Sequence, residues 1–228
     1  FPEEIDRIVT ARLAQYHYSP DEIAVKNLSG RKGVVVNTGG NTARDSMRLM
    51  QDVVNRKDDG EPFTLVSLHR AELLSNEPVL ITTIKELIEC SSNNRLVMVI
   101  DALTRSTLGH LNLLGQLQAS NIELHEKMAY PDFLEFVIGA ERVVTDSGGL
   151  QEECGFLKIP CLVHRKATER FDGIGQTARL SMWEAGAIKE FVSMNLLQSL
   201  PNEQKRRLSD DNSPTEVIIQ SLTEMKLL

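Results

Sequence analysis

The sequence is poor in aromatic residues and in cysteine, and it carries no excess of positive charge. Aromatic side chains make up 5% of its 228 residues, and the three cysteines are Cys90, Cys154 and Cys161. An odd number of cysteines without metal-type spacing fits reduced cytoplasmic thiols better than a disulfide framework or a zinc module. We therefore expect a cytoplasmic protein that holds no metal ion, and nothing in the sequence calls for another cofactor.

Charge and hydropathy exclude two further classes of partner. The formal net charge is −7 and the pI is near 5.3, which argues against nucleic acid and anionic membranes as partners. No apolar run approaches the roughly 20 residues that span a bilayer, and no signal peptide is visible. The sequence begins with Phe1-Pro2 rather than Met, from which we expect that a segment upstream of it has been removed.

What the sequence does contain is an alternation of short apolar runs with longer helical patterns. Because the apolar runs are continuous, both faces of each strand are expected to be covered by helices. This rhythm predicts an α/β fold with a doubly wound, Rossmann-like parallel sheet. The expected strands are 33–37, 63–68, 96–100, 122–124, 142–145 and 160–164, and the expected helices are 42–56, 78–90, 104–117, 130–138 and 150–157.

The two ends of the chain follow a different pattern. Residues 2–29 show helical patterns around 13–18 and after Ser19-Pro20, without a complete βαβ unit. Near the other end, Pro214 opens an amphipathic helix over 216–225, whose apolar stripe needs a partner surface.

The most informative segment is Val143-Val-Thr-Asp-Ser147-Gly148-Gly149-Leu-Gln-Glu-Glu153. It predicts a buried strand, a tight turn and a helix whose N-terminal N–H groups suit a phosphate. Gly148 and Gly149 lack a Cβ, Ser147 offers a hydroxyl, and Glu153 lies on the same helix face as Gly149. An ordinary strand–turn–helix with a serine cap is the alternative interpretation.

Basic residues follow two other expected strands. His69-Arg70 ends one of them, and Arg165, Lys166 and Arg170 follow another. At the carboxyl edge of a parallel sheet these groups would face the same crevice as Ser147 and would suit a diphosphate. The alternative in both cases is a solvated surface loop.

Two weaker patterns complete the set of candidates. Phe133, in a helix that begins near Tyr130, has an aromatic face that stacks on a base, although core packing is the simpler interpretation. The segment 38–42 lacks the dinucleotide-binding spacing, and we interpret it as a tight turn capped by Asn41 or Thr42.

Taken together, these residues resemble the non-hydrolysing UDP-N-acetylglucosamine 2-epimerases. The resemblance extends from Phe1 to about Leu180. Its signs are Pro2-Glu3-Glu4 with Arg7, Gly40-Asn41-Thr42, Leu68-His69-Arg70, Tyr130-x-x-Phe133, Thr145-Asp146-Ser147-Gly148-Gly149-Leu-Gln-Glu152-Glu153 and Thr168-Glu169-Arg170.

The resemblance implies a two-domain enzyme of the GT-B type, of which this chain is the later part. Residues 1–41 would end the N-terminal Rossmann-like domain, 42–212 would form the nucleotide-binding domain, and 213–228 would be a crossover helix. The partners implied are UDP-N-acetylglucosamine and UDP, with a homodimer as the complete form. The family eliminates UDP across C1–C2 and re-adds it to give UDP-N-acetylmannosamine; this chain alone is expected to be inactive.

The resemblance also implies a role for each candidate residue. Glu3 and His69 would be catalytic, with Arg7 supporting Glu3. Phe133 would pack on the uracil and Glu153 would bind the ribose hydroxyls. The diphosphate would be held by Ser147, Gly148, Gly149 and His69. Arg70 and Arg165, the basic residues expected at the strand ends, are candidates to bind the substrate beside them.

Several positions depart from the family pattern. Asp101 stands where a histidine is usual, Asp6 where an asparagine is expected, and Phe171 where a proline is expected. These departures leave the identity of the sugar and any regulatory nucleotide-sugar site open. They also leave two other functions open: a non-catalytic nucleotide-sugar binding protein and a glycosyltransferase of the same fold.

Overall fold

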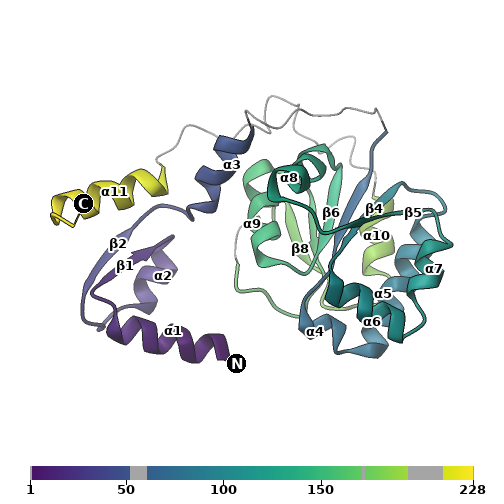
Figure 1. Cartoon of the computed structure of the whole chain (residues 1–228), viewed down its shortest axis with the longest axis horizontal. Helices are drawn as coiled ribbons and strands as arrows, with labels where there is room; N and C mark the ends of the chain where they lie inside the picture. The colour runs from purple at the N-terminus through teal and green to yellow at the C-terminus, as the bar shows by residue number, and fades with distance from the viewer. Residues whose placement is uncertain (1, 52–60, 171–172, 195–212, 228) are drawn as a thin grey trace. The chain divides into compact units, whose positions relative to one another are not determined.

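The computed structural model describes residues 2–51, 61–170, 173–194 and 213–227, with the backbone alone for residues 2, 3 and 51. The chain forms two compact units (Figure 1). Unit 1 comprises residues 1–51 and 209–228, and unit 2 comprises residues 52–208.

Unit 2 is built on a six-stranded sheet in which every neighbouring pair is parallel. The strand order is β5-β4-β3-β6-β7-β8, which is the 3-2-1-4-5-6 order of a doubly wound fold. The predicted fold class is therefore confirmed. The strands are β3 (Thr64–Ser67), β4 (Leu96–Ile100), β5 (Ile122–Glu126), β6 (Arg142–Thr145), β7 (Cys161–Val163) and β8 (Ala178–Leu180).

Helices cover both faces of this sheet, as the continuously apolar strands predicted. Helices α8 and α9 lie on one face, and α5, α7 and α10 lie on the other (Figure 1). The helices of unit 2 are α4 (Ala71–Leu74), α5 (Glu77–Cys90), α6 (Ala102–His110), α7 (Leu114–Gln118), α8 (Tyr130–Gly139), α9 (Gly148–Leu157) and α10 (Ala187–Ser193).

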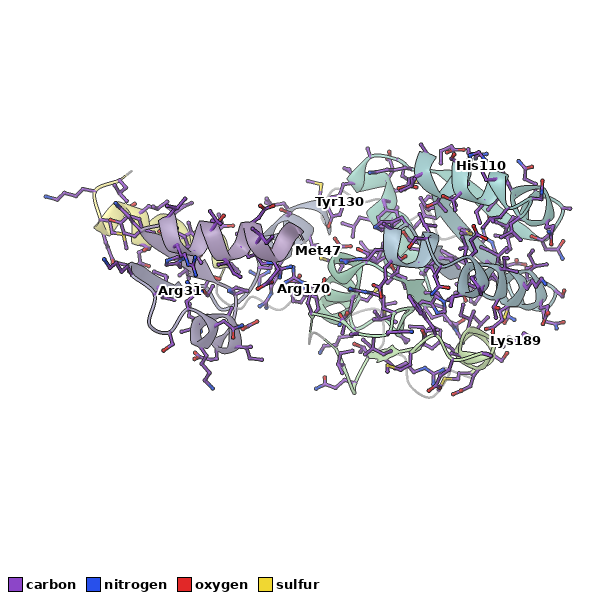
Figure 2. All side chains as sticks on the ribbon, turned by 90° about the horizontal axis from the view of Figure 1, so that it is seen from below. Arg31, Met47, His110, Tyr130, Arg170 and Lys189 are labelled. Atoms are coloured by element: carbon purple, nitrogen blue, oxygen red, sulfur yellow. The ribbon has the colours of Figure 1, made fainter. Side chains whose placement is uncertain are left out.

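The core of unit 2 lies between the sheet and its helices. Val66, Met98 and Ile100 are fully buried and pack in one cluster with side chains of α5 and α10. His110 and Lys189, in contrast, lie on the outside of the unit (Figure 2). Burial of apolar surface is the dominant favourable contribution to the free energy of folding. This core therefore holds in place the strand ends that carry the candidate site.

Two sequence predictions in unit 2 need correction. The expected helix 104–117 is two helices, because Asn112 takes a left-handed conformation with φ of 56° between α6 and α7. The strand β8 and the helix α10 were missed, since a three-residue strand carries too little periodicity to be recognised.

Unit 1 contains a small parallel βαβ unit, of which the second strand and the helix after Ser19-Pro20 were expected but the first strand was not. Strand β1 falls where a helical pattern was expected, and it alternates between half-buried and buried side chains. Gly33 permits its parallel partner to approach, since a Cβ there would lie 2.7 Å from the Gln15 carbonyl oxygen. The elements are α1 (Pro2–Leu13), β1 (Tyr16–Ser19), α2 (Glu22–Asn27), β2 (Val34–Asn37), α3 (Ala43–Gln51) and α11 (Pro214–Glu224).

The predicted C-terminal helix, α11, packs within unit 1. The Asp45 carboxylate accepts a hydrogen bond from the Thr215 N–H at 2.8 Å, and the Tyr18 hydroxyl donates to Ser221 at 3.4 Å. The part of the expected helix 42–56 beyond Gln51 lies outside the described residues. The turn before α3 is capped as predicted, because Asn41 accepts from the Ala43 N–H.

The partition of the complete protein into two domains and a crossover helix stays a prediction, because these units describe contacts within this chain alone. Among the described helices, none combines the length and the apolar character needed to cross a membrane.

Candidate functional site

The candidate site lies in unit 2, where the strand order reverses. Strand β3 is the first strand of this sheet in the sequence. The next two strands, β4 and β5, are added on one side of it, and the chain then returns to place β6 on the other side. Ligands of doubly wound sheets bind at the carboxyl ends of the strands at this switch point. His69-Arg70 follows β3, and Ser147-Gly148 follows β6, so two of the predicted segments meet there.

Asp146 joins these two segments. Its carboxylate is buried and accepts hydrogen bonds from the backbone N–H of His69 at 3.1 Å and of Arg70 at 2.9 Å. Burial raises the pKa of Asp146, while these N–H donors and the nearby His69 ring oppose the rise. The hydrogen bonds to Asp146 hold the turn after β3 against the end of β6.

Helix α9 begins at the predicted glycine pair. Ser147 is its N-cap, and the hydroxyl accepts from the Leu150 N–H at 3.4 Å. This arrangement matches the predicted strand, turn and helix start. A Cβ on Gly148 would lie 3.0 Å from a Glu169 carboxylate oxygen, whereas one on Gly149 would meet nothing closer than 3.8 Å. Of these two glycines, Gly148 is therefore the one whose backbone a neighbouring side chain approaches more closely.

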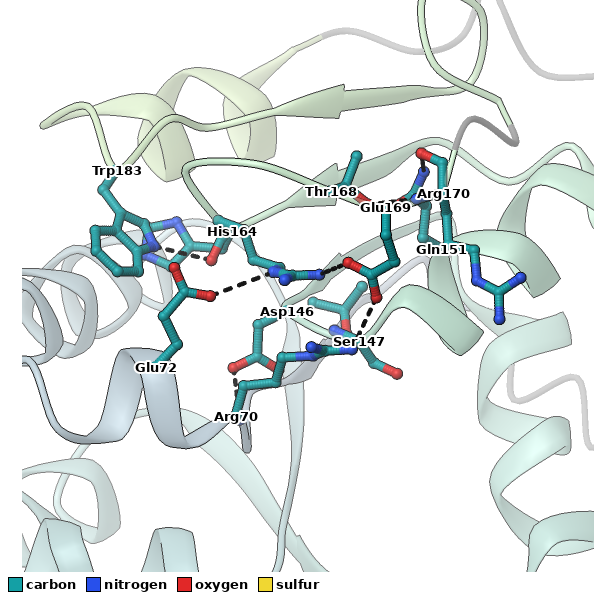
Figure 3. Close-up of polar contacts among 12 residues, drawn as sticks. Arg70, Glu72, Asp146, Ser147, Gln151, His164, Thr168, Glu169, Arg170 and Trp183 are labelled. Carbon is teal, nitrogen blue, oxygen red and sulfur yellow. Dashed lines mark hydrogen bonds and ion pairs between the residues drawn. The ribbon is translucent and has the colours of Figure 1, made fainter. Parts of the chain in front are cut away.

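A carboxylate lies between the two predicted arginines. Glu169 accepts from Arg70 Nη2 at 3.2 Å through one oxygen and from Arg165 Nη1 at 2.7 Å through the other (Figure 3). Arg165 also lies 3.6 Å from the Glu72 carboxylate. Partial burial by itself raises the pKa of Glu169, but the hydrogen bond from Arg165 and the charges of both arginines hold it below its usual value.

The other basic residues after β7 do not join this cluster. Lys166 lies over the Trp183 ring, 5.1 Å from its centroid. Arg170 forms an ion pair with the buried Glu152 at 3.4 Å. Of the three cations that predicted an anion site here, only Arg165 thus contacts the same carboxylate as Arg70.

A pocket of about 320 Å³ opens beside the β3 end of the site. Phe133, the predicted uracil contact, lines it together with His69 and Tyr130. Asp101, the main departure from the family pattern, also lines it and caps α6 by accepting from the Thr104 N–H at 2.7 Å. The remaining lining residues are Ser67, Val99, Lys127 and Met128. The pocket is predominantly apolar with a few polar groups, which is typical of small-molecule sites.

Glu153 is tied to this pocket through Tyr130. The Tyr130 hydroxyl donates to the Glu153 carboxylate at 3.1 Å. Burial raises the pKa of Glu153 to about 7; the Tyr130 hydrogen bond opposes the rise and the charge of Glu152 adds to it. Burial, and then the charge and hydrogen bond of Glu153, raise the pKa of Tyr130.

The two site residues predicted from the first segment of the chain lie in unit 1. Glu3 is on α1, and its side chain lies outside the described part of the structure. The Arg7 guanidinium lies 3.8 Å from Glu4 on the same helix, with both side chains largely exposed. Their roles stay predictions.

Comparison with known proteins places these features in a family. The model of the UDP-N-acetylglucosamine 2-epimerase family matches residues 1–218. The chain belongs to the UDP-N-acetylglucosamine 2-epimerase family. It is 31% identical over 185 residues to the UDP-N-acetylglucosamine 2-epimerase of Methanocaldococcus jannaschii, covering 74% of this chain and 50% of that relative. This resemblance to the family, expected from the sequence, is confirmed.

One further relative and one solved structure define how far the likeness extends. The chain is 30% identical over 179 residues to the UDP-2,3-diacetamido-2,3-dideoxy-D-glucuronate 2-epimerase of Pseudomonas aeruginosa, covering 74% of this chain and 48% of that relative. The crystal structure of the M. jannaschii epimerase in complex with UDP-GlcNAc and UDP matches with a TM-score of 0.83 and 26% identity, covering 98% of this chain and 65% of that one. The chain thus spans about half the length of the curated relatives it matches.

His69, Arg70, Ser147, Gly148 and Arg165 lie near one another at the strand ends, as the expected strand order predicted, while their binding roles stay predictions. The contacts of Asp146 and Glu169 were not predicted. Asp146 directly precedes Ser147, and Glu169 sits in Thr168-Glu169-Arg170, so both lay within segments that had been singled out. For Glu169 the available signal was an acidic residue beside a run of cations, where a partner for those cations is expected.

Proposed function

We propose that the protein containing this chain is a UDP-N-acetylglucosamine 2-epimerase and that unit 2 binds its UDP moiety. One observation carries the proposal. At the switch point of a doubly wound sheet, the N-terminus of α9 begins beside Arg70 and Arg165, next to a pocket lined by an aromatic ring. A helix N-terminus with two guanidiniums suits a diphosphate, and the pocket suits a base.

The parts of the nucleotide can be assigned to residues in turn. The uracil would pack on Phe133, and the ribose hydroxyls would donate to the Glu153 carboxylate. The diphosphate would lie over the turn that starts α9, bound by Ser147, Gly148, Gly149 and the cations His69, Arg70 and Arg165. The support for this assignment is the closeness of these groups in unit 2 and the family to which the chain belongs.

The reaction we propose is removal of the C2 proton with elimination of UDP from C1, which gives a glucal intermediate. UDP then re-adds at C1 while a proton returns to C2 with the opposite configuration. The departing diphosphate gains negative charge, and positioned cations and helix N–H groups stabilise it. His69 has a half-exposed side chain and is placed to donate to that phosphate. Removal of the C2 proton needs a base; Glu3, supported by Arg7, is the carboxylate of this chain that we propose near the sugar.

A second substrate deserves a test because of one relative. The P. aeruginosa relative is named for a diacetamido uronate rather than for UDP-N-acetylglucosamine. Both compounds are UDP-sugars, so the assignments in unit 2 serve either. The two differ at the sugar, and a comparison of the two substrates decides between them.

The test uses the complete protein that contains this chain. Incubation with UDP-N-acetylglucosamine in D₂O is expected to give the manno epimer, with one deuterium at C2 observed by NMR. Ligand binding by this chain is tested separately by calorimetry with UDP, where Ser147→Ala and Glu153→Ala are expected to weaken binding. An absence of C2 exchange with either UDP-sugar contradicts the epimerase, and equal UDP affinity in all three chains contradicts the assigned diphosphate and ribose contacts.

The setting of the enzyme is also part of the proposal. The three cysteines are free and buried, which supports a reducing compartment such as the cytoplasm. We propose a homodimer as the complete form, to be checked by light scattering.

A further inference from the structure

We propose that Glu169 is a built-in competitor for the diphosphate: its carboxylate occupies the anion position between Arg70, Arg165 and the start of α9, and the nucleotide must displace it. The inference rests on the proposed function, because it assumes that a phosphate binds at this turn. It adds a residue that sets how strongly the site discriminates a charged nucleotide from an uncharged nucleoside.

The contacts of Glu169 are those that a phosphate would make. One carboxylate oxygen faces Arg70 at 3.2 Å and the other faces Arg165 at 2.7 Å, so the group bridges two guanidiniums (Figure 3). The oxygen that faces Arg70 also lies 3.0 Å from the point where Gly148 would carry a Cβ. An anion with oxygens in these places excludes a second anion from the same volume.

The position of Glu169 is built by its neighbours rather than by chance packing of an exposed side chain. Gln151 of α9 is fully buried; it donates to the Arg170 carbonyl at 3.0 Å and accepts from the Thr168 hydroxyl at 2.7 Å. Arg170 is also paired with the buried Glu152. The residues on both sides of Glu169 are therefore anchored to α9, which leaves its backbone above the first turn of that helix.

The side chain itself can leave without disturbing the core. The Glu169 side chain is 43% exposed, whereas the buried anchors Gln151 and Glu152 stay in place when it rotates. Arg165 keeps a second carboxylate partner in Glu72. Displacement thus costs one partly exposed bridge, and a diphosphate with more charge than a carboxylate can replace it.

Charge decides the expected consequence. When Glu169 is ionised, binding of another anion costs the free energy needed to separate the carboxylate from the two arginines. Uridine has no phosphate and leaves this bridge intact. Glu169→Gln removes the charge but keeps a similar shape, so we expect UDP and inorganic pyrophosphate to bind roughly three- to tenfold more tightly, with uridine unchanged.

The experiment is a calorimetric titration of the 228-residue chain and its Glu169→Gln variant with UDP, pyrophosphate and uridine. Glu72→Gln is the matched control, because it also removes a carboxylate from Arg165, but Glu72 is not among the side chains nearest to Gly148. We expect a smaller gain in UDP affinity for Glu72→Gln than for Glu169→Gln. Thermal unfolding of each variant checks that it is folded.

Each result decides the matter. Equal or weaker UDP binding in Glu169→Gln, with uridine binding intact, overturns the competitor and leaves the proposed nucleotide site standing; Glu169 would then position the arginines. Equal gains in Glu72→Gln and Glu169→Gln also overturn it, because net charge alone would explain them. If no chain binds uridine, UDP or pyrophosphate, the proposed function fails together with this inference.

Discussion

The candidate site has a pocket side, with Tyr130 and Glu153, and an arginine side, with Arg70, Arg165 and Glu169. The pKa of the glutamate is shifted in opposite directions on the two sides. On the pocket side, burial beside Tyr130 raises the pKa of Glu153 to about 7. On the arginine side, burial is the largest single effect and raises the pKa of Glu169. The hydrogen bond from Arg165 and the charges of Arg165 and Arg70 together outweigh it, so the pKa lies below its usual value. One side is governed by desolvation and the other by paired charge.

This difference teaches which conditions act on which side. Interactions between exposed charges are screened by salt, whereas a buried carboxyl responds chiefly to pH. A uridine nucleotide would engage both sides at once, through its base and ribose on one and its phosphates on the other. Salt and pH series with uridine and UDP therefore separate the two contributions.

A substitution of Asp146, which contacts both sides of the site, is expected to have the largest effect on stability and on ligand binding. Asp146 holds the backbone of His69, which lines the pocket, and of Arg70, which binds Glu169. In Asp146→Ala these N–H groups lose a buried acceptor, and we expect about 2–4 kcal/mol of lost stability together with loss of uridine and UDP binding. Urea unfolding and calorimetry measure the two effects.

Asp146→Asn is the control for that variant, because it keeps an acceptor oxygen while removing the charge. We expect its stability to lie between those of the wild type and Asp146→Ala. A stability of Asp146→Ala within about 0.5 kcal/mol of the wild type, which is the range of an ordinary surface substitution, contradicts the anchoring role.

The behaviour of Asp146 also shows what the sequence could predict and what it could not. Apolar runs such as Leu96–Ile100 predicted the sheet, because a strand buried on both faces needs no tertiary information to be recognised. Parallel strands end at one edge, so the meeting of His69 with Ser147 followed from strand order alone. Nothing local indicated that Asp146 would accept from the turn after β3, a contact across 77 positions.

The partners of the charged side chains were the other feature that could not be predicted from the sequence. Arg165, Lys166 and Arg170 formed one basic run in the sequence, but they have three different partners in the fold. Strand β1 was missed for a related reason, since its alternation of buried and half-buried positions depends on pairing with β2. Where a residue's environment is made by distant segments, its pattern in the sequence carries little information.

The pocket side alone is tested by pH. The folded-state pKa of Glu153, about 7, lies above the ordinary value of 4.5, so the folded state holds an extra proton between these values. Stability therefore falls as pH rises from about 4.5 through 7. In Glu153→Gln this fall is removed, and above pH 8 we expect a relative gain on the order of 1–2 kcal/mol, allowing for partial exposure.

Uridine binding provides an independent measurement on the same variant. If the ribose hydroxyls donate to the ionised carboxylate, wild-type affinity rises by up to roughly tenfold between pH 6 and 8, as the ionised fraction grows. Glu153→Gln is expected to show no such rise. If wild type and Glu153→Gln show the same pH dependence of stability and the same pH dependence of uridine affinity, Glu153 is not the group that titrates on the pocket side.

The smallest expected effect distinguishes the two glycines at the start of α9. An alanine at Gly149 meets only Ser147 Oγ at 3.8 Å, so it gains helix propensity, by up to about 1 kcal/mol. An alanine at Gly148 would press on Glu169 at 3.0 Å and on Arg170 Cγ at 3.2 Å, which offsets that gain. We expect Gly148→Ala to be less stable than Gly149→Ala by about 1 kcal/mol in urea unfolding.

A double-mutant cycle assigns that difference to the arginine side. In a Glu169→Ala background the nearest contact of the new Cβ disappears, so the loss caused by Gly148→Ala is expected to shrink, while the Arg170 contact keeps part of it. Gly149→Ala should have the same effect in both backgrounds, since it does not touch Glu169. An unchanged loss for Gly148→Ala would mean that the contact with Arg170, rather than the Glu169 carboxylate, disfavours a Cβ at this position.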